Sequence, residues 1–329
     1  MSTFPAPAVL VIACLCAGLM GYAIQRGATC TVAAVDELLH EHRGTRLLAI
    51  VEAALWVLGG LLLARAAGLP VPMPAGYAAG MTTVLGAGLL GAGAALNRAC
   101  VFGAIARFGN GDWAYLATPF GYWLGCRAVV LLQTMAPQAL AQPAPVLQAP
   151  ALLTLLAGLW LGGRLLAGVL RGLRGGRAGF IRRLTAGVWA PHAATLVIGV
   201  TFLLLLALVG PWTYTDLLAE LAHGPAMAAG PRLLLFAALL VGAAWGGLSA
   251  GRFRPLAPRL SALVRCAAGG ALMGLGSLLI PGGNDGLLLL GMPLLWPHAW
   301  LAFAVMAVTI ALWLTLAARV PLHFSRRPA

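Results

Sequence analysis

The chain has 329 residues, of which 61% are hydrophobic and 9% are charged, and its mean hydropathy is +0.93. A soluble domain of this size could not cover its surface with so few charged side chains, so the composition excludes a soluble globular protein and predicts a polytopic, all-α membrane protein. The net charge is +13, which in this setting predicts arginine-rich cytoplasmic loops rather than nucleic-acid binding.

Nine apolar stretches are long enough to cross a bilayer, because a spanning helix needs about 20 apolar residues. Four other segments are too short or too polar to span, and each follows a glycine or proline break. Such segments are typical of re-entrant helices, which are tolerated where protein buries them or where they line a cavity. The predicted spans are 8–24, 46–67, 77–95, 115–135, 151–170, 188–210, 231–250, 262–280 and 298–318, and the predicted re-entrant helices are 29–42, 98–110, 212–222 and 284–291.

Arginine is distributed unevenly between the two sets of connecting segments. One set includes the basic run 171–183, whereas the opposite loops contain no arginine and comprise 68–76, 136–150, 211–231 and 281–297. The positive-inside rule therefore places the C-terminus in the cytoplasm and, with nine spans, the N-terminus outside. We expect residues 1–329 to form one transport domain of two inverted halves, about 8–170 and 188–318, joined by a basic cytoplasmic loop at 171–187.

A glycine followed nine positions later by a break recurs along the chain. The pairs are Gly21 with Cys30, Gly91 with Cys100, and Gly274 with Gly283. A repeated unit of small-residue span, break and short helix is typical of membrane transporters built from internal repeats.

Three segments around these breaks resemble the signatures of the YeeE/YedE family of sulfur-compound membrane transporters. They are QRGATCTVAAVDELL (25–39), NRACVFGAIARFGNGDW (97–113) and GGALMGLGSLLIPGGNDGLLLLG (269–291), and the resemblance extends from residue 18 to about residue 318. It implies an inner-membrane protein with an hourglass-shaped fold that takes up thiosulfate or a related sulfur anion. It also implies that neutral cysteine thiols along a constriction pass the anion inward. Members with three such cysteines carry the third where this chain has Gly283, so only Cys30 and Cys100 carry over.

The residues expected along the substrate path combine weak donors, amides and positive charge. A neutral thiol can contact an anion without trapping it, and the N-terminus of a half-helix adds N–H groups and a positive dipole end. The two asparagines can either donate to the anion or cap a half-helix, and the two arginines can concentrate anions or merely follow the positive-inside rule. The path residues are Cys30, Cys100, Asn97, Gly283, Asn284, Arg26 and Arg98.

Other residues have simpler expected roles. Free cysteines usually pack as small hydrophobes, which we expect of Cys14, Cys16, Cys126 and Cys266. Glycines in spans commonly allow close helix packing, which we expect of Gly18, Gly21, Gly88, Gly91, Gly270 and Gly274. Charge inside a span is costly, so Arg127 and Arg164 need an explanation, and Glu52 is a candidate partner for such a charge. His192 and His298 follow prolines at span starts and are expected at the interface.

The chain contains no lysine and therefore no Walker-type nucleotide site, so transport is expected to be passive, ion-coupled or dependent on a separate protein. We expect no enzymatic activity, cofactor, metal or nucleic-acid partner. The expected partners are thiosulfate or a similar small sulfur anion, the lipid bilayer and a cytoplasmic sulfur-carrier protein. Two alternatives stay open: a membrane sensor or accessory protein that binds a sulfur anion without transporting it, and a thiol oxidoreductase that uses Cys30 and Cys100 as an interconverting pair.

Overall fold

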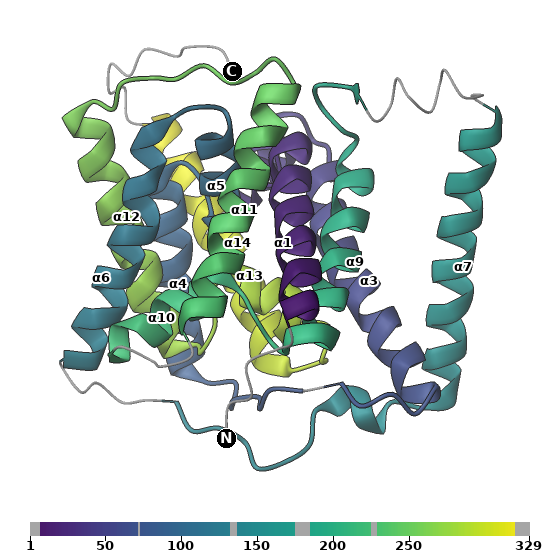
Figure 1. The fold of residues 1–329 in the computed structure, drawn as a ribbon. Helices are drawn as coiled ribbons and strands as arrows, with labels where there is room; N and C mark the ends of the chain where they lie inside the picture. Colours follow the sequence, from purple (N-terminus) through teal and green to yellow (C-terminus); the bar gives the residue numbers. More distant parts are fainter. Residues whose placement is uncertain (1–6, 72, 132–136, 175–184, 225–228, 320–329) are drawn as a thin grey trace.

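The computed structural model describes residues 7–71, 73–131, 137–174, 185–224 and 229–319. Helices dominate these residues and no multi-residue strand occurs among them, which confirms the predicted all-α class (Figure 1). Within the described ranges, eight helices are long and apolar enough to cross a membrane, so the protein is a multi-pass membrane protein. A further helix, α6, occupies the place of the predicted fourth span, but its 15 described residues stop where residues 132–136 begin.

The described helices fall into a long and a short class. The long helices are α1 (Pro7–Gly27), α3 (Thr45–Ala66), α4 (Met81–Asn97), α6 (Ala117–Leu131), α7 (Ala151–Arg174), α9 (Pro191–Val209), α11 (Ala229–Ser249), α12 (Leu260–Leu279) and α14 (Pro297–Arg319). The short ones are α2 (Thr31–His40), α5 (Val101–Gly109), α10 (Tyr214–His223) and α13 (Asn284–Gly286), which continues as a π-helical turn, η3 (Leu287–Gly291). The four short helices lie where re-entrant segments were predicted. Two 3₁₀ turns, η1 (Trp113–Leu116) and η2 (Pro145–Gln148), complete the set.

The order of long and short helices repeats along the described chain. The sequence long, short, long, long, short, long runs from α1 to α6 and again from α9 to α14. Helix α7 stands between the two series and has no counterpart in either. Most of the predicted basic loop lies in residues 175–184, which are outside the described part of the chain.

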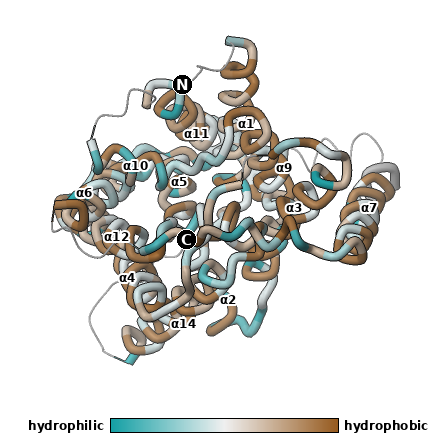
Figure 2. The backbone as a smooth tube through the Cα atoms, turned by 90° about the horizontal axis from the view of Figure 1, so that it is seen from below, coloured by the Kyte–Doolittle hydropathy of each residue, from teal (hydrophilic) through white to brown (hydrophobic). Residues whose placement is uncertain are grey.

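The long helices other than α7 form two groups of four. One group contains α4, α6, α12 and α14, and the other contains α1, α3, α9 and α11; in Figure 2 the two groups lie on either side of the short helix α5. Each group takes two helices from each series. The short helices bridge the groups, because α2 contacts both α3 and α14 while α10 contacts both α6 and α11. The protein interior between the groups is thus filled by the short helices.

Small residues permit close contact within the groups. A Cβ added at Gly274 would lie 2.0 Å from the Tyr122 carbonyl oxygen, and one added at Gly21 would lie 2.0 Å from the Leu239 carbonyl oxygen. Most of the glycines predicted to serve packing make such contacts. Gly88 is an exception, since a Cβ there would meet nothing within 4 Å, so packing does not require glycine at this position.

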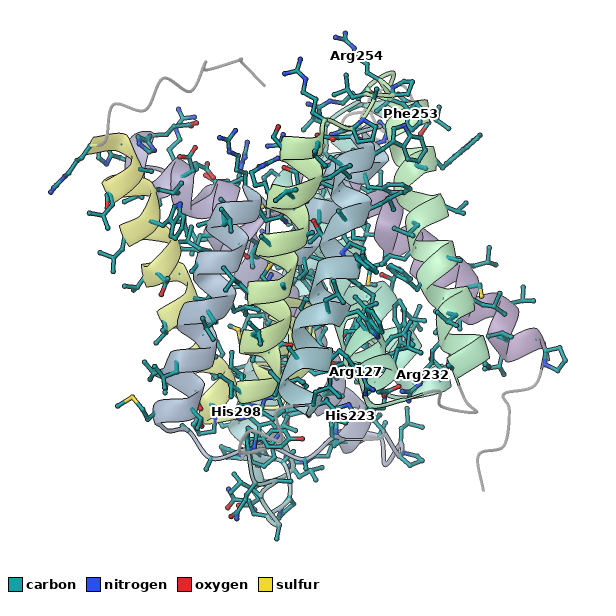
Figure 3. All side chains as sticks on the ribbon, turned by 90° about the vertical axis from the view of Figure 1, so that its left-hand side faces the viewer. Arg127, His223, Arg232, Phe253, Arg254 and His298 are labelled. Atoms are coloured by element: carbon teal, nitrogen blue, oxygen red, sulfur yellow. The ribbon has the colours of Figure 1, made fainter. Side chains whose placement is uncertain are left out.

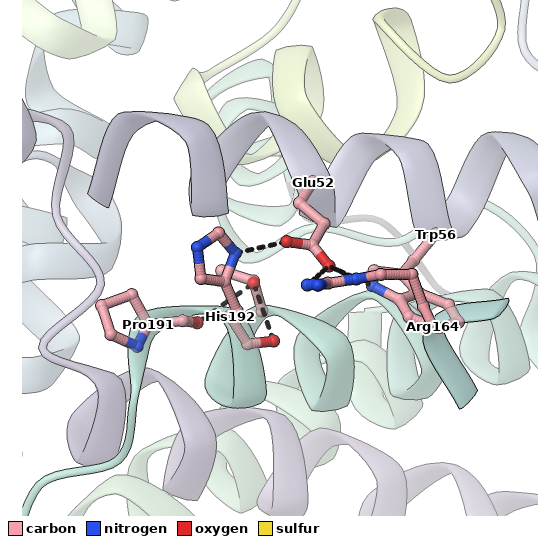
Figure 4. Close-up of polar contacts among 6 residues, drawn as sticks. Glu52, Trp56, Arg164, Pro191 and His192 are labelled. Carbon is pink, nitrogen blue, oxygen red and sulfur yellow. Dashed lines mark hydrogen bonds and ion pairs between the residues drawn. The ribbon is translucent and has the colours of Figure 1, made fainter. Parts of the chain in front are cut away.

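Helix α7 stands apart from both groups and packs mainly on α3 (Figure 1). A four-residue polar cluster holds it against α3 and α9 (Figure 4). The Glu52 carboxylate of α3 accepts a hydrogen bond from Arg164 Nε of α7 at 2.9 Å, pairs with His192 of α9, and accepts from Trp56 Nε1 at 3.3 Å. Glu52 is therefore the partner of Arg164 rather than of Arg127. The cluster neutralises a charge that would otherwise face hydrocarbon.

Arginines lie at both ends of the molecule, and those named at the lower end have local partners. Arg254 lies at the upper end in Figure 3, whereas Arg127 and Arg232 lie near the lower end. The lower-end arginines have local partners, since Arg127 donates to the Ala222 carbonyl at the end of α10 at 2.9 Å and Arg232 pairs with Glu220. Arg127 thus satisfies a carbonyl that a helix end leaves without an intrahelical partner.

Candidate functional site

The site is a neck built from the first residues of the four short helices. We define the neck by the residues that precede these helices: Cys30, Cys100, Thr213 and Gly283. All four have extended backbone conformations, for example φ −156° and ψ 125° at Cys30. The chain reaches this conformation after a break, because α1 ends at Gly27 before Ala28 with φ 47°, and α4 ends before Arg98 with φ 61°. The sequence breaks therefore bring four helix N-termini into the protein interior.

Hydrogen bonds link the four short helices in a closed ring. The Thr31 N–H of α2 donates to Cys100 Sγ, beside α5, at 3.2 Å, and the Tyr214 hydroxyl of α10 donates to the Val101 carbonyl of α5 at 2.9 Å. Next, the Thr215 hydroxyl of α10 donates to Asp285 of α13. The Asn284 amide of α13 closes the ring by donating to the Thr31 hydroxyl at 3.4 Å. Both halves of the chain therefore contribute to one polar layer.

The two predicted thiols meet in this layer. Cys100 is fully buried and Cys30 is 9% exposed, and neither forms a disulfide. Their side chains interact with each other, and a Cβ added at Gly103 would lie 2.5 Å from Cys30 Sγ. Neither cysteine caps its own helix with a side-chain hydrogen bond, although the Thr31 N–H of α2 donates to Cys100 Sγ. The N-termini of α2 and α5 therefore direct their partial positive charge at the thiols. Two thiols and two helix ends are thus concentrated at one point.

Three of the predicted path residues lie beside the neck rather than in it. Asn97 is fully buried, and both ends of its amide are bonded, to the Ala99 carbonyl at 2.8 Å and the Thr118 hydroxyl at 3.1 Å. Arg26 is buried and donates to Ser249 Oγ at 2.9 Å and to the Ala186 carbonyl, which links α1 to the end of α11 and to the segment before α9. Arg98 is exposed at the end of α4. Asn97 and Arg26 therefore have structural partners that account for their burial.

Gly283 and Asn284 are connected to the thiols through Thr31. Asn284 is fully buried; its Nδ2 bonds Thr31, and its Oδ1 has no hydrogen-bond partner within the described residues. A Cβ at Gly283 would lie 2.3 Å from Thr215 Oγ1 and 2.7 Å from Tyr122 Oη. Two hydroxyl groups therefore occupy the space that a side chain at position 283 would need.

A cavity of about 170 Å³ lies next to the Gly282–Gly286 loop at the lower end of the molecule. Tyr77, Asp216, Trp296 and His298 contribute polar groups to its wall. Asp216 belongs to the half-helix α10 rather than to a spanning helix, and burial raises the pKa of its carboxyl. Burial, followed by the negative charge of Asp216, also raises the pKa of Asp285 in the half-helix α13. Asp216 therefore lines the cavity and Asp285 lies one residue before the cavity-lining Gly286, and both carboxyls bind a proton at a higher pH than an ordinary aspartate does.

Sequence reasoning identified the cysteines of the neck but missed its hydroxyl groups. Thr31, Thr213, Tyr214 and Thr215 all lie at short-helix starts, and Tyr122 reaches the neck from α6. The first four could have been found by aligning the break before α10 with the break before α2. No sequence signal pointed to Tyr122, because the sequence of an apolar span does not show which distant segment a tyrosine in it contacts.

Comparison with known proteins supports the reading of the motifs. Comparison with curated proteins found no match. The sequence profile of a family described as Sulphur transport matches residues 26–312, which include all four short helices and the whole neck. The match covers most of the 329 residues and agrees with the resemblance carried by the Cys30, Cys100 and Gly283 segments. The chain therefore belongs to the Sulphur transport family of membrane proteins.

Proposed function

We propose that this protein carries thiosulfate, or a closely related sulfur anion, across the inner membrane into the cytoplasm, and that it does so without enzymatic chemistry. The observation that carries the proposal is the meeting of two buried thiols with the uncapped N-termini of α2 and α5 inside a membrane protein of the Sulphur transport family. The anion passes Cys30 and Cys100 in turn, and each neutral thiol donates a weak hydrogen bond to it.

The physical requirement is a site that replaces hydration without holding the anion too tightly. Helix N-termini supply N–H groups and a positive potential, while thiols are weaker donors than hydroxyls or amides. Contacts of this kind suit conduction, in which binding must permit both entry and exit. The apolar surroundings of Cys100, which include Val101 and Phe102, favour the uncharged thiol over a thiolate that would repel the anion.

We infer the orientation of the protein in the membrane from the positive-inside rule, which places arginine-rich loops in the cytoplasm. We place the upper end of Figure 3, with Arg254, in the cytoplasm, and the lower end, with the cavity beside Asp216, outside. This orientation gives an external N-terminus and a cytoplasmic C-terminus. The repeated helix order supports two inverted halves, α1–α6 and α9–α14, with α7 outside the symmetry.

Uptake into cells that lack their own thiosulfate importer tests the proposal. Cells expressing the protein are expected to accumulate labelled thiosulfate and to grow on it as the sulfur source, whereas the Cys100→Ala variant does neither. Sulfite, sulfate and selenium oxyanions offered separately define the substrate. Wild-type expression without uptake of any of these anions would overturn the proposal.

A thiol oxidoreductase is the second candidate function, because Cys30 and Cys100 are neighbours. It predicts that the pair alternates between dithiol and disulfide during turnover. Transport by thiol contact instead predicts that both thiols stay reduced throughout uptake. Counting alkylated cysteines by mass spectrometry before and during uptake separates the two functions.

A sensor or accessory protein would bind the anion without moving it, so the same uptake assay decides against that alternative if anion accumulates. We also propose that a cytoplasmic sulfur-carrier protein receives the anion at the Arg98 side of the neck. Co-purification of such a protein, abolished by substituting exposed arginines at that end, is the expected result. Failure of any soluble sulfur-carrier protein to co-purify with the wild type would contradict this partner.

A further inference from the structure

Position 283 is where related three-cysteine sequences are expected to carry a further thiol, and here it has no side chain. The space is not empty, because Thr215 Oγ1 and Tyr122 Oη lie 2.3 Å and 2.7 Å from the place of a Cβ. Thr215 donates its hydroxyl hydrogen to Asp285. The acceptor of the Thr215 hydrogen is thus known, and the remaining hydroxyl beside Gly283 is that of Tyr122.

The Tyr122 hydroxyl is buried without a partner. The residue is 1% exposed, and its Oη has no hydrogen bond within the part of the chain that the structure describes. Buried hydroxyls are nearly always bonded, because an unpaired polar group in a protein interior lowers stability. Within hydrogen-bond geometry, neither Ser277 nor Asp285 is a partner of Tyr122. Ser277 donates to the Gly274 carbonyl at 2.8 Å, and Asp285 accepts from the hydroxyl and the backbone N–H of Thr215. The hydroxyl thus has a donor hydrogen available for a ligand.

Asn284 supplies a second unpaired group next to the same position. Its amide bonds Thr31 through one end, and the other end, buried, has no partner among the described residues. Rotation of the amide by 180° lets the Thr31 hydroxyl donate to Oδ1 and leaves the NH₂ free. The unpaired end can therefore act as a donor, so a hydroxyl and an amide that can both donate flank Gly283.

We propose that Tyr122 is a specificity-determining donor, and that its hydroxyl and the Asn284 amide bind a terminal oxygen of the transported anion beside Gly283. The proposal rests on the proposed function and deepens it. A phenol hydroxyl is a stronger donor to oxygen than a thiol is. The site therefore selects sulfur anions by their oxygen atoms before they reach Cys100.

The test compares Tyr122→Phe with Tyr115→Phe, in purified full-length protein, using thiosulfate as the probe. Tyr115 is the matched control, because it lies outside the neck and its buried hydroxyl already donates to the Asn97 carbonyl at 3.3 Å. Tyr122→Phe is expected to leave the Tm without ligand unchanged or raised, and to weaken thiosulfate binding by about tenfold or more, the usual effect of losing a hydrogen bond to a charged group. Tyr115→Phe is expected to lower the Tm and to leave the thiosulfate affinity within about twofold.

A second variant tests the same site if Tyr122→Phe folds poorly. Asn284→Asp keeps the shape of the side chain and the bond to Thr31 but replaces the donor with a charge that repels the anion, so binding is expected to be lost. Wild-type affinity in either folded variant overturns the inference. If Cys100→Ala abolishes uptake while Tyr122→Phe binds and transports normally, this inference alone fails. If the wild type neither binds nor transports any sulfur anion, the proposed function fails first.

Discussion

The side-chain amide of Asn284 is hydrogen-bonded to the Thr31 hydroxyl at 3.4 Å, although 253 positions separate the two residues in sequence. This contact joins a half-helix of the second series to one of the first. Thr31 also donates its N–H to Cys100 at 3.2 Å, so one threonine connects the cysteine layer to the Gly283 break. Both halves of the chain thus build the neck, and a substitution in one half is expected to alter the packing of the neck residues of the other half.

A cysteine introduced at position 283 is expected to destabilise the protein rather than to restore a third relay thiol. Its Cβ would overlap Thr215 Oγ1 and Tyr122 Oη, and overpacking of this kind typically costs about 1–3 kcal/mol. Thermal unfolding of Gly283→Cys in detergent measures this cost. The cost should shrink when Tyr122→Phe and Thr215→Ala are added, because the overlapping oxygens are gone. An equal Tm for Gly283→Cys and the wild type would contradict the described packing.

Two glycines in spanning helices should respond oppositely to alanine. Gly274→Ala places a methyl group 2.0 Å from the Tyr122 carbonyl and must push α12 away from α6, so we expect a large fall in Tm. Gly88→Ala meets nothing within 4 Å and gains helix propensity, which is worth about 1 kcal/mol in a helix interior. A similar loss in both variants would show that α4 packs differently around Gly88.

Loss of the Glu52 carboxylate is expected to loosen α7. Glu52→Gln leaves Arg164 without its counter-charge, and an unpaired arginine in a spanning helix costs about 2–3 kcal/mol. The expected readouts are a lower Tm and faster proteolysis at the connections of α7. Glu37→Gln is the control, since Glu37 pairs with Arg46 at 3.6 Å in a partly exposed setting where an ion pair is worth about 0–1 kcal/mol. Equal effects of the two substitutions would contradict a stabilising role for the cluster.

Uptake is expected to increase as the external pH falls. Burial raises the pKa of Asp216, so its carboxyl binds a proton at a higher pH than an ordinary aspartate, and the neutral form no longer repels an anion in the adjacent cavity. Asp216→Asn should flatten the pH profile between roughly pH 5 and pH 8 and keep uptake high throughout. Glu37→Gln is the control, because Glu37 pairs with Arg46 and is not among the charges that shift the pKa of Asp216. An unchanged profile in Asp216→Asn would remove Asp216 from the path.

Much of this fold could be predicted from hydropathy and breaks. Apolar length identified the spanning helices, and the glycine and proline breaks located all four short helices, because both signals are local in sequence. The hydroxyl groups at the neck could not be predicted in this way. Tyr122 lies in an apolar helix, and only the packing of α6 against α12 brings its hydroxyl to Gly283. Similarly, Asn97 looked equally suited to an anion or a helix end, and only its bonds to Ala99 and Thr118 show how its amide is used.

The most direct test of transport by thiol contact is the initial rate of labelled thiosulfate entry into proteoliposomes that contain only this protein. Cys100→Ala should reduce the rate to that of empty liposomes, and Cys30→Ala should do the same. Cys266→Ala should retain the wild-type rate, because Cys266 is equally buried but lies in the spanning helix α12 and not at the start of a short helix. Wild-type entry rates in Cys100→Ala would contradict the account.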